Sequence, residues 1–137
     1  MTRREARENA VGLLFEYGFR TDADAAKIYE KAEDVRELPD DEFVRSLFFG
    51  AVENLDAIDA VISENARGWK LERLSGVSRA VLRLGTYEML YTDVPDSVAV
   101  NEAIEIIKKY DDEKARPFVN GILNAVMKSR AGENTGD

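Results

Sequence analysis

Three arginines stand within the first seven residues of this chain, at positions 3, 4 and 7. If the segment is helical, Arg3 and Arg7 are four residues apart and Arg4 and Arg7 three apart, so the three side chains share one arc. Cations at the amino end of a helix oppose its dipole, and stability alone would favour carboxylates there. The cluster therefore suggests a phosphate-bearing partner. The alternative is a solvated helix start with intrahelical ion pairs, because Glu5 and Glu8 are close by.

A second group of basic residues surrounds Trp69, the only tryptophan. Basic side chains interleaved with an aromatic ring suit either base stacking or a protein interface. The alternative places Trp69 in the core and pairs the basic residues with the acidic helix that precedes them; for Trp69 itself the core is favoured. The members of the group are Arg67, Lys70, Arg73, Arg79 and Arg83, and the last two share a helix face.

The chain contains neither histidine nor cysteine. The commonest general base, the thiol nucleophile, the usual zinc ligands and disulfides are therefore excluded. Glu102 and Glu105 form a helical carboxylate pair, but a di-iron site of this kind needs Glu-x-x-His repeats. We interpret that pair as structural, and 111–113 (Asp-Asp-Glu) as a helix cap. We expect no enzymatic activity, no cofactor and no bound metal.

The net charge of −8 is unevenly distributed along the 137 residues. Residues 21–66 and 93–137 carry the negative excess, whereas residues 1–20 and 67–92 are net positive by one and three charges. Attraction between charges extends over roughly a Debye length of ~10 Å, so local basic surfaces can act on an acidic body. The composition therefore does not exclude a nucleic-acid partner.

The amino terminus passes directly into an amphipathic pattern, without the apolar region of a signal peptide. No apolar run approaches the roughly 18–20 residues that span a bilayer. Together with the absence of cysteine, these features predict a cytoplasmic protein.

Apolar residues recur at three- and four-residue spacing along nearly the whole chain, which predicts an all-α fold. Thr2 and Glu5 have the spacing of a capping box for a first helix. We predict one domain over residues 1–130, a compact bundle of about six to seven helices, and a disordered tail over 131–137. The later helices are expected at 24–37, as one long helix at 43–62, as a short turn at 71–74, after Ser75, after 93–97, and from Pro117 onward.

Asn120 and Gly121 interrupt the apolar stripe of the last predicted helix. A glycine in the middle of a helix costs about 1 kcal/mol relative to alanine. The pair suggests either a close approach of another helix or a stretch of backbone kept clear for a partner.

Four ordered blocks of sequence resemble the NusB family of antitermination factors. They span about residues 3–127, and the ordered set is more specific than any one block. The blocks are Arg4–Val11, the stretch from Gly68-Trp69 through Arg73-Leu74 and Arg79–Leu84 to Tyr87-Glu88, Asp93–Glu105, and Phe118–Leu123.

This resemblance implies two helical sub-bundles and a role in binding boxA RNA of ribosomal RNA leader transcripts jointly with NusE, a ribosomal protein. It also implies a place in the RNA polymerase antitermination complex. Phosphates would be contacted by Arg3, Arg4 and Arg7, with Phe15 and Phe118 near bases. Arg79 and Arg83 would lie where the RNA and NusE surfaces come close together. Arg83 would also contact RNA, and the partner contacts would come from Trp69, Arg79 and Arg83.

Two other functions compete with this one. The acidic body favours a protein-interaction module with little RNA affinity of its own. A third hypothesis is a NusB-like domain of a ribosomal RNA cytosine methyltransferase. The lack of a cofactor-binding domain and of cysteine argues against it. The pattern leaves open whether the free protein is a monomer or a homodimer.

Overall fold

The computed structural model describes residues 1–19, 24–66, 68 and 73–135, and within them it contains seven helices and no strand. The predicted all-α fold of about six to seven helices is confirmed. The helices are α1 (Arg3–Phe19), α2 (Ala25–Val35), α3 (Glu42–Glu53), α4 (Leu55–Asn65), α5 (Gly76–Tyr91), α6 (Asp96–Tyr110) and α7 (Ala115–Thr135).

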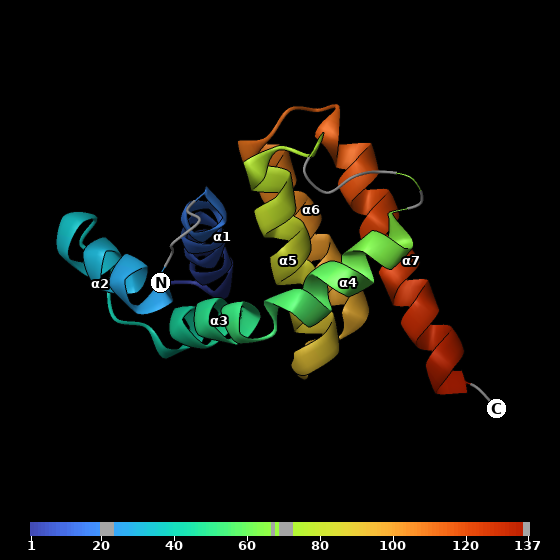
Figure 1. The fold of residues 1–137 in the computed structure, drawn as a ribbon, viewed down its shortest axis with the longest axis horizontal. Helices are drawn as coiled ribbons and strands as arrows, with labels where there is room; N and C mark the ends of the chain where they lie inside the picture. The colour runs from blue at the N-terminus through green and yellow to red at the C-terminus, as the bar shows by residue number, and fades with distance from the viewer. Residues whose placement is uncertain (20–23, 67, 69–72, 136–137) are drawn as a thin grey trace.

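The helices form two groups, α1 to α3 and α4 to α7, as the resemblance implied (Figure 1). In the first group α1 packs against α2 and α3. In the second, α5 packs against α4, α6 and α7, and α6 against α7. The groups are joined because α5 also packs against α1 and α3. This central position makes α5 the element that connects side chains from both groups.

Side-chain caps account for several of the helix starts. The backbone N–H of Glu5 donates to Thr2 Oγ1 at 3.0 Å, and the backbone N–H of Thr2 donates to Glu5 Oε1 at 2.8 Å, so the predicted capping box is present. The hydrogen bond from the Thr2 backbone also lowers the pKa of Glu5. Asp24, Asp41 and Ser75 accept hydrogen bonds from the first turns of α2, α3 and α5.

The long helix predicted over 43–62 is wrong, because the chain breaks at Asn54 into α3 and α4 (Figure 1). The Asn54 side chain donates to the carbonyl of Gly50 at 2.8 Å, and its backbone leaves the helical region at φ −113° and ψ 19°. The break has a packing reason: α3 packs against α1 and α5, whereas α4 packs against α5 and α7. One straight helix could not direct a single apolar stripe at both groups.

The core runs through both groups of helices and includes the stripe residues expected from the sequence, such as Leu47, Ile58 and Ile62. The three helices α5, α6 and α7 meet closely at Gly85, where a Cβ would lie 3.2 Å from Leu123. Among the described residues, the polar or charged side chains buried with the core are Arg7, Ser78, Thr86 and Glu88.

Pro117 lies in the first turn of α7, as predicted. The helix continues to Thr135, beyond the predicted end of the domain, and disorder of the tail stays a prediction. Trp69 and part of the turn expected at 71–74 lie outside the described residues. Among the residues that are described, no helix is both long and apolar enough to cross a bilayer.

Candidate nucleic-acid interface

Arg7 of α1 and Glu88 of α5 form a buried ion pair. Arg7 Nε donates to Glu88 Oε1 at 2.8 Å, and Arg7 Nη2 donates to Glu88 Oε2 at 3.0 Å. The two side chains are only 8% and 2% exposed. A two-point arrangement of this kind is the geometry that lets a guanidinium and a carboxylate remain charged away from water. The pair connects the two groups of helices.

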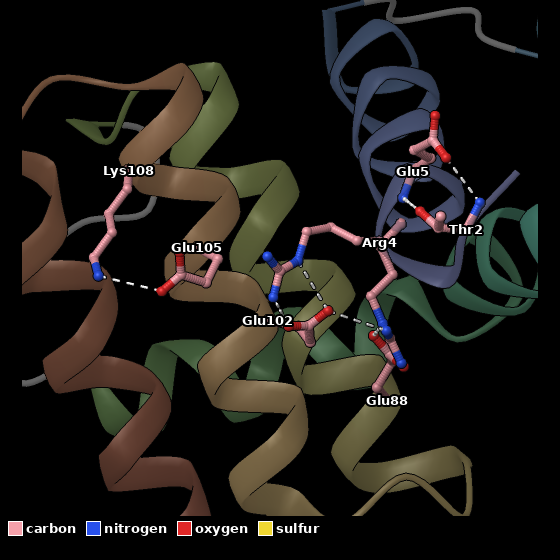
Figure 2. A network of polar contacts seen from close by, with 8 residues as sticks. Thr2, Arg4, Glu5, Glu88, Glu102, Glu105 and Lys108 are labelled. Carbon is pink, nitrogen blue, oxygen red and sulfur yellow. Dashed lines mark hydrogen bonds and ion pairs between the residues drawn. The ribbon is translucent and has the colours of Figure 1, made fainter.

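Glu102 of α6 joins this pair to Arg4. Arg4 donates to Glu102 from Nη2 at 2.6 Å and from Nε at 3.3 Å, and Arg7 Nη1 donates to the same carboxylate at 3.5 Å. Figure 2 shows the Glu102 carboxylate facing the Arg4 guanidinium, with Glu88 on the neighbouring helix. We call Arg4, Arg7, Glu88 and Glu102 the arginine–glutamate cluster. It ties α1 to α5 and α6.

The cluster holds its outer pair in the charged state. The hydrogen bond from Arg4 lowers the pKa of Glu102, and the hydrogen bond to Glu102 raises the pKa of Arg4. The Arg4 side chain is 51% exposed, whereas Glu102 is 14% exposed. The guanidinium of Arg4 therefore borders solvent on one side and a carboxylate on the other.

Arg3 has a different environment from its two neighbours. Its side chain is exposed, and its guanidinium carbon lies 4.0 Å from the centre of the Phe43 ring of α3, a cation–π contact. Within the described part of the chain, no carboxylate pairs with it. An open groove of about 660 Å³ borders Arg3 and Phe43, with Asp41 and Glu42 also in its lining.

The three arginines that the sequence grouped on one arc of a helix thus differ in exposure and in pairing. Arg3 is exposed, Arg4 is half-exposed and paired, and Arg7 is buried. The intrahelical ion pairs of the alternative interpretation are wrong, because the partners of Arg4 and Arg7 lie on α5 and α6. Within α1, Glu5 caps the helix and Glu8 accepts hydrogen bonds from α6, from Lys109 at 2.9 Å and Tyr110 at 2.6 Å.

The carboxylates assigned to structure form three separate sets of contacts. Glu102 binds the arginines described above, whereas Glu105 pairs with Lys108 at 3.2 Å (Figure 2). Asp111 accepts hydrogen bonds from the hydroxyls of Ser75 and Ser78, at 2.5 and 2.7 Å, and so ties the end of α6 to the start of α5. Burial favours a raised pKa for Asp111, but these hydrogen bonds outweigh it and lower the pKa.

Phe15 lies on the carboxyl half of α1 and is half-buried. Its ring meets the Phe19 ring edge-on at 4.7 Å, and it packs so closely on Gly76 of α5 that a Cβ there would lie 2.8 Å from it. With Val77 and Tyr110, Phe15 borders a groove of about 440 Å³ between α1, α5 and α6. A stacking face on this groove is compatible with contact to a base.

Arg83 of α5 pairs with Asp59 of α4 through two hydrogen bonds, each of 2.9 Å. This confirms, for Arg83, the alternative in which the second basic group pairs with the preceding acidic helix. Arg79, one turn earlier, is half-buried, and the described residues give it no ion pair. Trp69, the third residue assigned to partner binding, lies outside the described residues.

Phe118 lies on α7 beside a shallow groove of about 960 Å³ between α4 and α7. The groove also borders Asn124 and Lys128, and none of its described lining residues comes from α1. Gly121 is on this face, and a Cβ there would meet no atom within 4 Å, so close helix packing does not explain the glycine. The predicted RNA-binding residues are therefore spread over separate surfaces rather than gathered in one pocket.

Comparison with known proteins identifies the family. Residues 4–128 match the NusB family. The chain belongs to the NusB family. Two of the curated relatives, both transcription antitermination proteins NusB, are 40% identical over 131 residues (Pediococcus pentosaceus) and 42% identical over 127 residues (Bacillus cereus). These matches cover 93% and 92% of this chain, and 98% and 97% of the relatives.

Solved structures of NusB proteins share the fold. NusB of T. maritima is 42% identical, with a TM-score of 0.82 over 93% of this chain and 92% of that chain. A crystal structure of NusB and NusE in complex with double-stranded RNA matches with 27% identity and a TM-score of 0.81, over 93% and 96% of the two chains. Membership of this family bears out the expectation of a non-enzymatic protein.

Proposed function

We propose that this protein is a transcription antitermination factor that binds RNA together with the ribosomal protein NusE. The observation that carries the proposal is the likeness, over 93% of the chain, to NusB in a complex with NusE and double-stranded RNA. The curated relatives, which are antitermination proteins at 40–42% identity, support the same role. We further propose that the RNA is of the boxA type, from ribosomal RNA leaders, and that the protein acts in the cytoplasm within the RNA polymerase antitermination complex.

Arg3 and Arg4 are the best-placed phosphate contacts, because both guanidinium groups reach solvent at the start of α1. The buried pair of Arg7 favours a positioning role over the direct phosphate contact predicted from the sequence. Phe15 and Phe118 are proposed to stack on bases, each beside an open groove. Because these grooves are separate, the RNA would have to cross more than one face of the molecule.

NusE is proposed to bind near α5, where Arg79 and Arg83 lie one turn apart, with Trp69 as a further contact. Arg83 can contribute to RNA binding as well only if it shares its guanidinium between Asp59 and the ligand, because Asp59 already occupies two of its donors. The net charge of −8 makes weak binding of RNA alone the expectation, with NusE supplying the missing affinity.

The test is fluorescence anisotropy of a labelled boxA-like RNA, with a scrambled RNA of equal length as control, with and without NusE and at two salt concentrations. We expect binding to be tighter for the boxA-like RNA, to tighten with NusE, and to weaken as salt rises. Absence of RNA binding under every condition would contradict the proposal. Equal binding of the two RNAs would contradict the boxA assignment alone.

A protein-interaction module with little RNA affinity is the second candidate. One observation favours it: Arg4, Arg7 and Arg83 each have a carboxylate partner within the fold. In the same experiment, such a module would capture NusE without changing the anisotropy of the RNA.

A further inference from the structure

The four members of the arginine–glutamate cluster cancel in formal charge. Two guanidinium groups, Arg4 and Arg7, face two carboxylates, Glu88 and Glu102. Of the three arginines near the amino terminus, only Arg3 adds a positive charge that no carboxylate in the described part of the chain offsets by pairing. Pairing within the fold therefore offsets most of the positive charge of the three arginines.

The two carboxylates, Glu88 and Glu102, differ in their exposure to solvent. Glu88 is 2% exposed, and both of its oxygens accept from Arg7, so it is enclosed in the fold. Glu102 is 14% exposed and faces Arg4, whose side chain is 51% exposed. Any anion that reaches Arg4 from solvent must therefore approach Glu102, and not Glu88.

We propose that Glu102 limits the affinity of this protein for RNA by competing with an RNA phosphate for Arg4. The inference rests on the proposed function, and it concerns the strength of RNA binding at the same site. Glu102 occupies Arg4 Nε and Nη2, the edge of the guanidinium that would otherwise be available for two-point binding of a phosphate. A phosphate must either displace Glu102 or accept from the remaining donors with a carboxylate close by.

Binding of a phosphate to the remaining donors of Arg4, with Glu102 still in place, is unfavourable for an electrostatic reason. A phosphate bound to the outer side of the Arg4 guanidinium lies within a Debye length of the Glu102 carboxylate, so the two negative charges repel with little screening. The low exposure of Glu102 weakens screening further. For a separation of about 7 Å and an effective dielectric constant between those of the protein surface and water, removing this repulsion corresponds to a gain of roughly 3- to 10-fold in affinity.

The experiment is Glu102→Gln, measured by anisotropy with the boxA-like RNA in the presence of NusE. The glutamine keeps an oxygen that accepts from Arg4 and removes the charge, while Arg7 keeps its pair with Glu88. We expect RNA affinity to rise by about 3- to 10-fold, and the plot of log affinity against log salt to steepen by up to about 0.7, the value of one added phosphate contact on a single strand. Unchanged or weaker binding would overturn the inference, since a carboxylate that only positions Arg4 predicts a loss.

Glu105→Gln is the matched control. It removes the same charge from the same helix one turn away, but Glu105 pairs with Lys108 and makes no hydrogen bond to Arg4. We expect its effect to be less than half that of Glu102→Gln. An equal gain from both variants would show that net charge alone is responsible and would overturn the specific role of Glu102. Circular dichroism and thermal unfolding establish that each variant is folded.

Arg4→Ala separates failure of the inference from failure of the proposed function. If the proposed function is correct, Arg4→Ala weakens RNA binding, and in that background Glu102→Gln loses most of its gain. Weaker binding by Arg4→Ala with no gain from Glu102→Gln would overturn the inference and leave the function standing. No RNA binding by the wild-type protein with NusE would overturn the proposed function itself.

Discussion

The two ends of α1 make different kinds of contact with the rest of the molecule. The amino end carries the arginine–glutamate cluster, in which charged side chains bond to α5 and α6. The carboxyl end carries Phe15 and Phe19, whose rings pack near Gly76 of α5. At the first end the arginines already pair with carboxylates, whereas at the second an aromatic ring borders a groove that Glu5 and Glu8 also line. The same helix thus presents paired cations at one end and an aromatic ring at the other, and the RNA contacts proposed for the two ends should differ in their dependence on salt.

The largest effect is expected at Arg7, the buried arginine at the amino end of α1. Arg7→Ala leaves Glu88 as an unpaired carboxylate in the core, and breaking a buried pair from one side costs about 3–5 kcal/mol of unfolding free energy. Urea unfolding monitored by circular dichroism measures the loss. Replacing both residues by leucine should restore much of the stability, because no buried charge is then left over. A loss below about 1 kcal/mol in the single variant would show that the pair is not buried in solution.

Phe15→Ala tests the aromatic end. If a base stacks on Phe15, the variant should lose about 1–3 kcal/mol of RNA-binding free energy, with the slope of the salt dependence unchanged. Phe15→Tyr keeps the stacking face and serves as the control, so it should bind like the wild type. Loss of binding in both variants, or in neither, would contradict a stacking role. Anisotropy titrations in the presence of NusE provide the measurement.

Arg4→Ala tests whether the more exposed Arg4 contributes less to stability than the buried Arg7, which lies three residues further along the same helix. Because Arg4 is half-exposed, its ion pair with Glu102 should contribute little to stability, and the thermal midpoint should fall by about 2 °C or less. The same variant should weaken RNA binding, whereas the principal loss in Arg7→Ala is stability. A large fall in the midpoint for Arg4→Ala, comparable with that of Arg7→Ala, would remove the distinction between the two halves of the cluster.

The smallest effect concerns pH. The hydrogen bond from Arg4 lowers the pKa of Glu102 in the folded protein, so this pair stabilises the fold above the ordinary glutamate pKa, and the stabilisation is lost as the pH falls through the lowered value. Thermal midpoints of the wild type and of Arg4→Ala should therefore differ near neutral pH and converge in acid, as Glu102 becomes protonated in the folded protein. A difference that stays constant across this acid range would show that the contribution of Arg4 is not electrostatic.

The helix starts could be predicted because their signals are local. The capping box of Thr2 and Glu5 and the cap at Ser75 each involve residues three apart, and both form as the spacing indicates. The break at Asn54 could not be predicted in this way. The apolar spacing continues through Asn54 without a proline or glycine at that position, and the helix ends there because its two halves pack on different partners.

The site could be predicted in its composition but not in its pairing. Arg7 stands at helical spacing from Val11 and Leu14, both buried, and Glu88 stands at such spacing from Leu84. Both charges therefore lie on apolar stripes, a signal that the prediction of Arg7 as a phosphate contact did not use. A buried charge requires a partner. That partner lies 81 residues away, and only the packing of α1 on α5 identifies it.

The most direct test of the central claim, that this fold presents Arg3 and Arg4 to RNA, is the salt dependence of RNA binding by the double variant Arg3→Ala/Arg4→Ala, with NusE present. Each phosphate contact on a single strand contributes about 0.7 to the slope of log affinity against log salt. We expect a slope shallower than that of the wild type by about 0.7 to 1.4, the lower figure applying if Glu102 keeps Arg4 occupied. An unchanged slope and affinity would show that neither arginine contacts RNA.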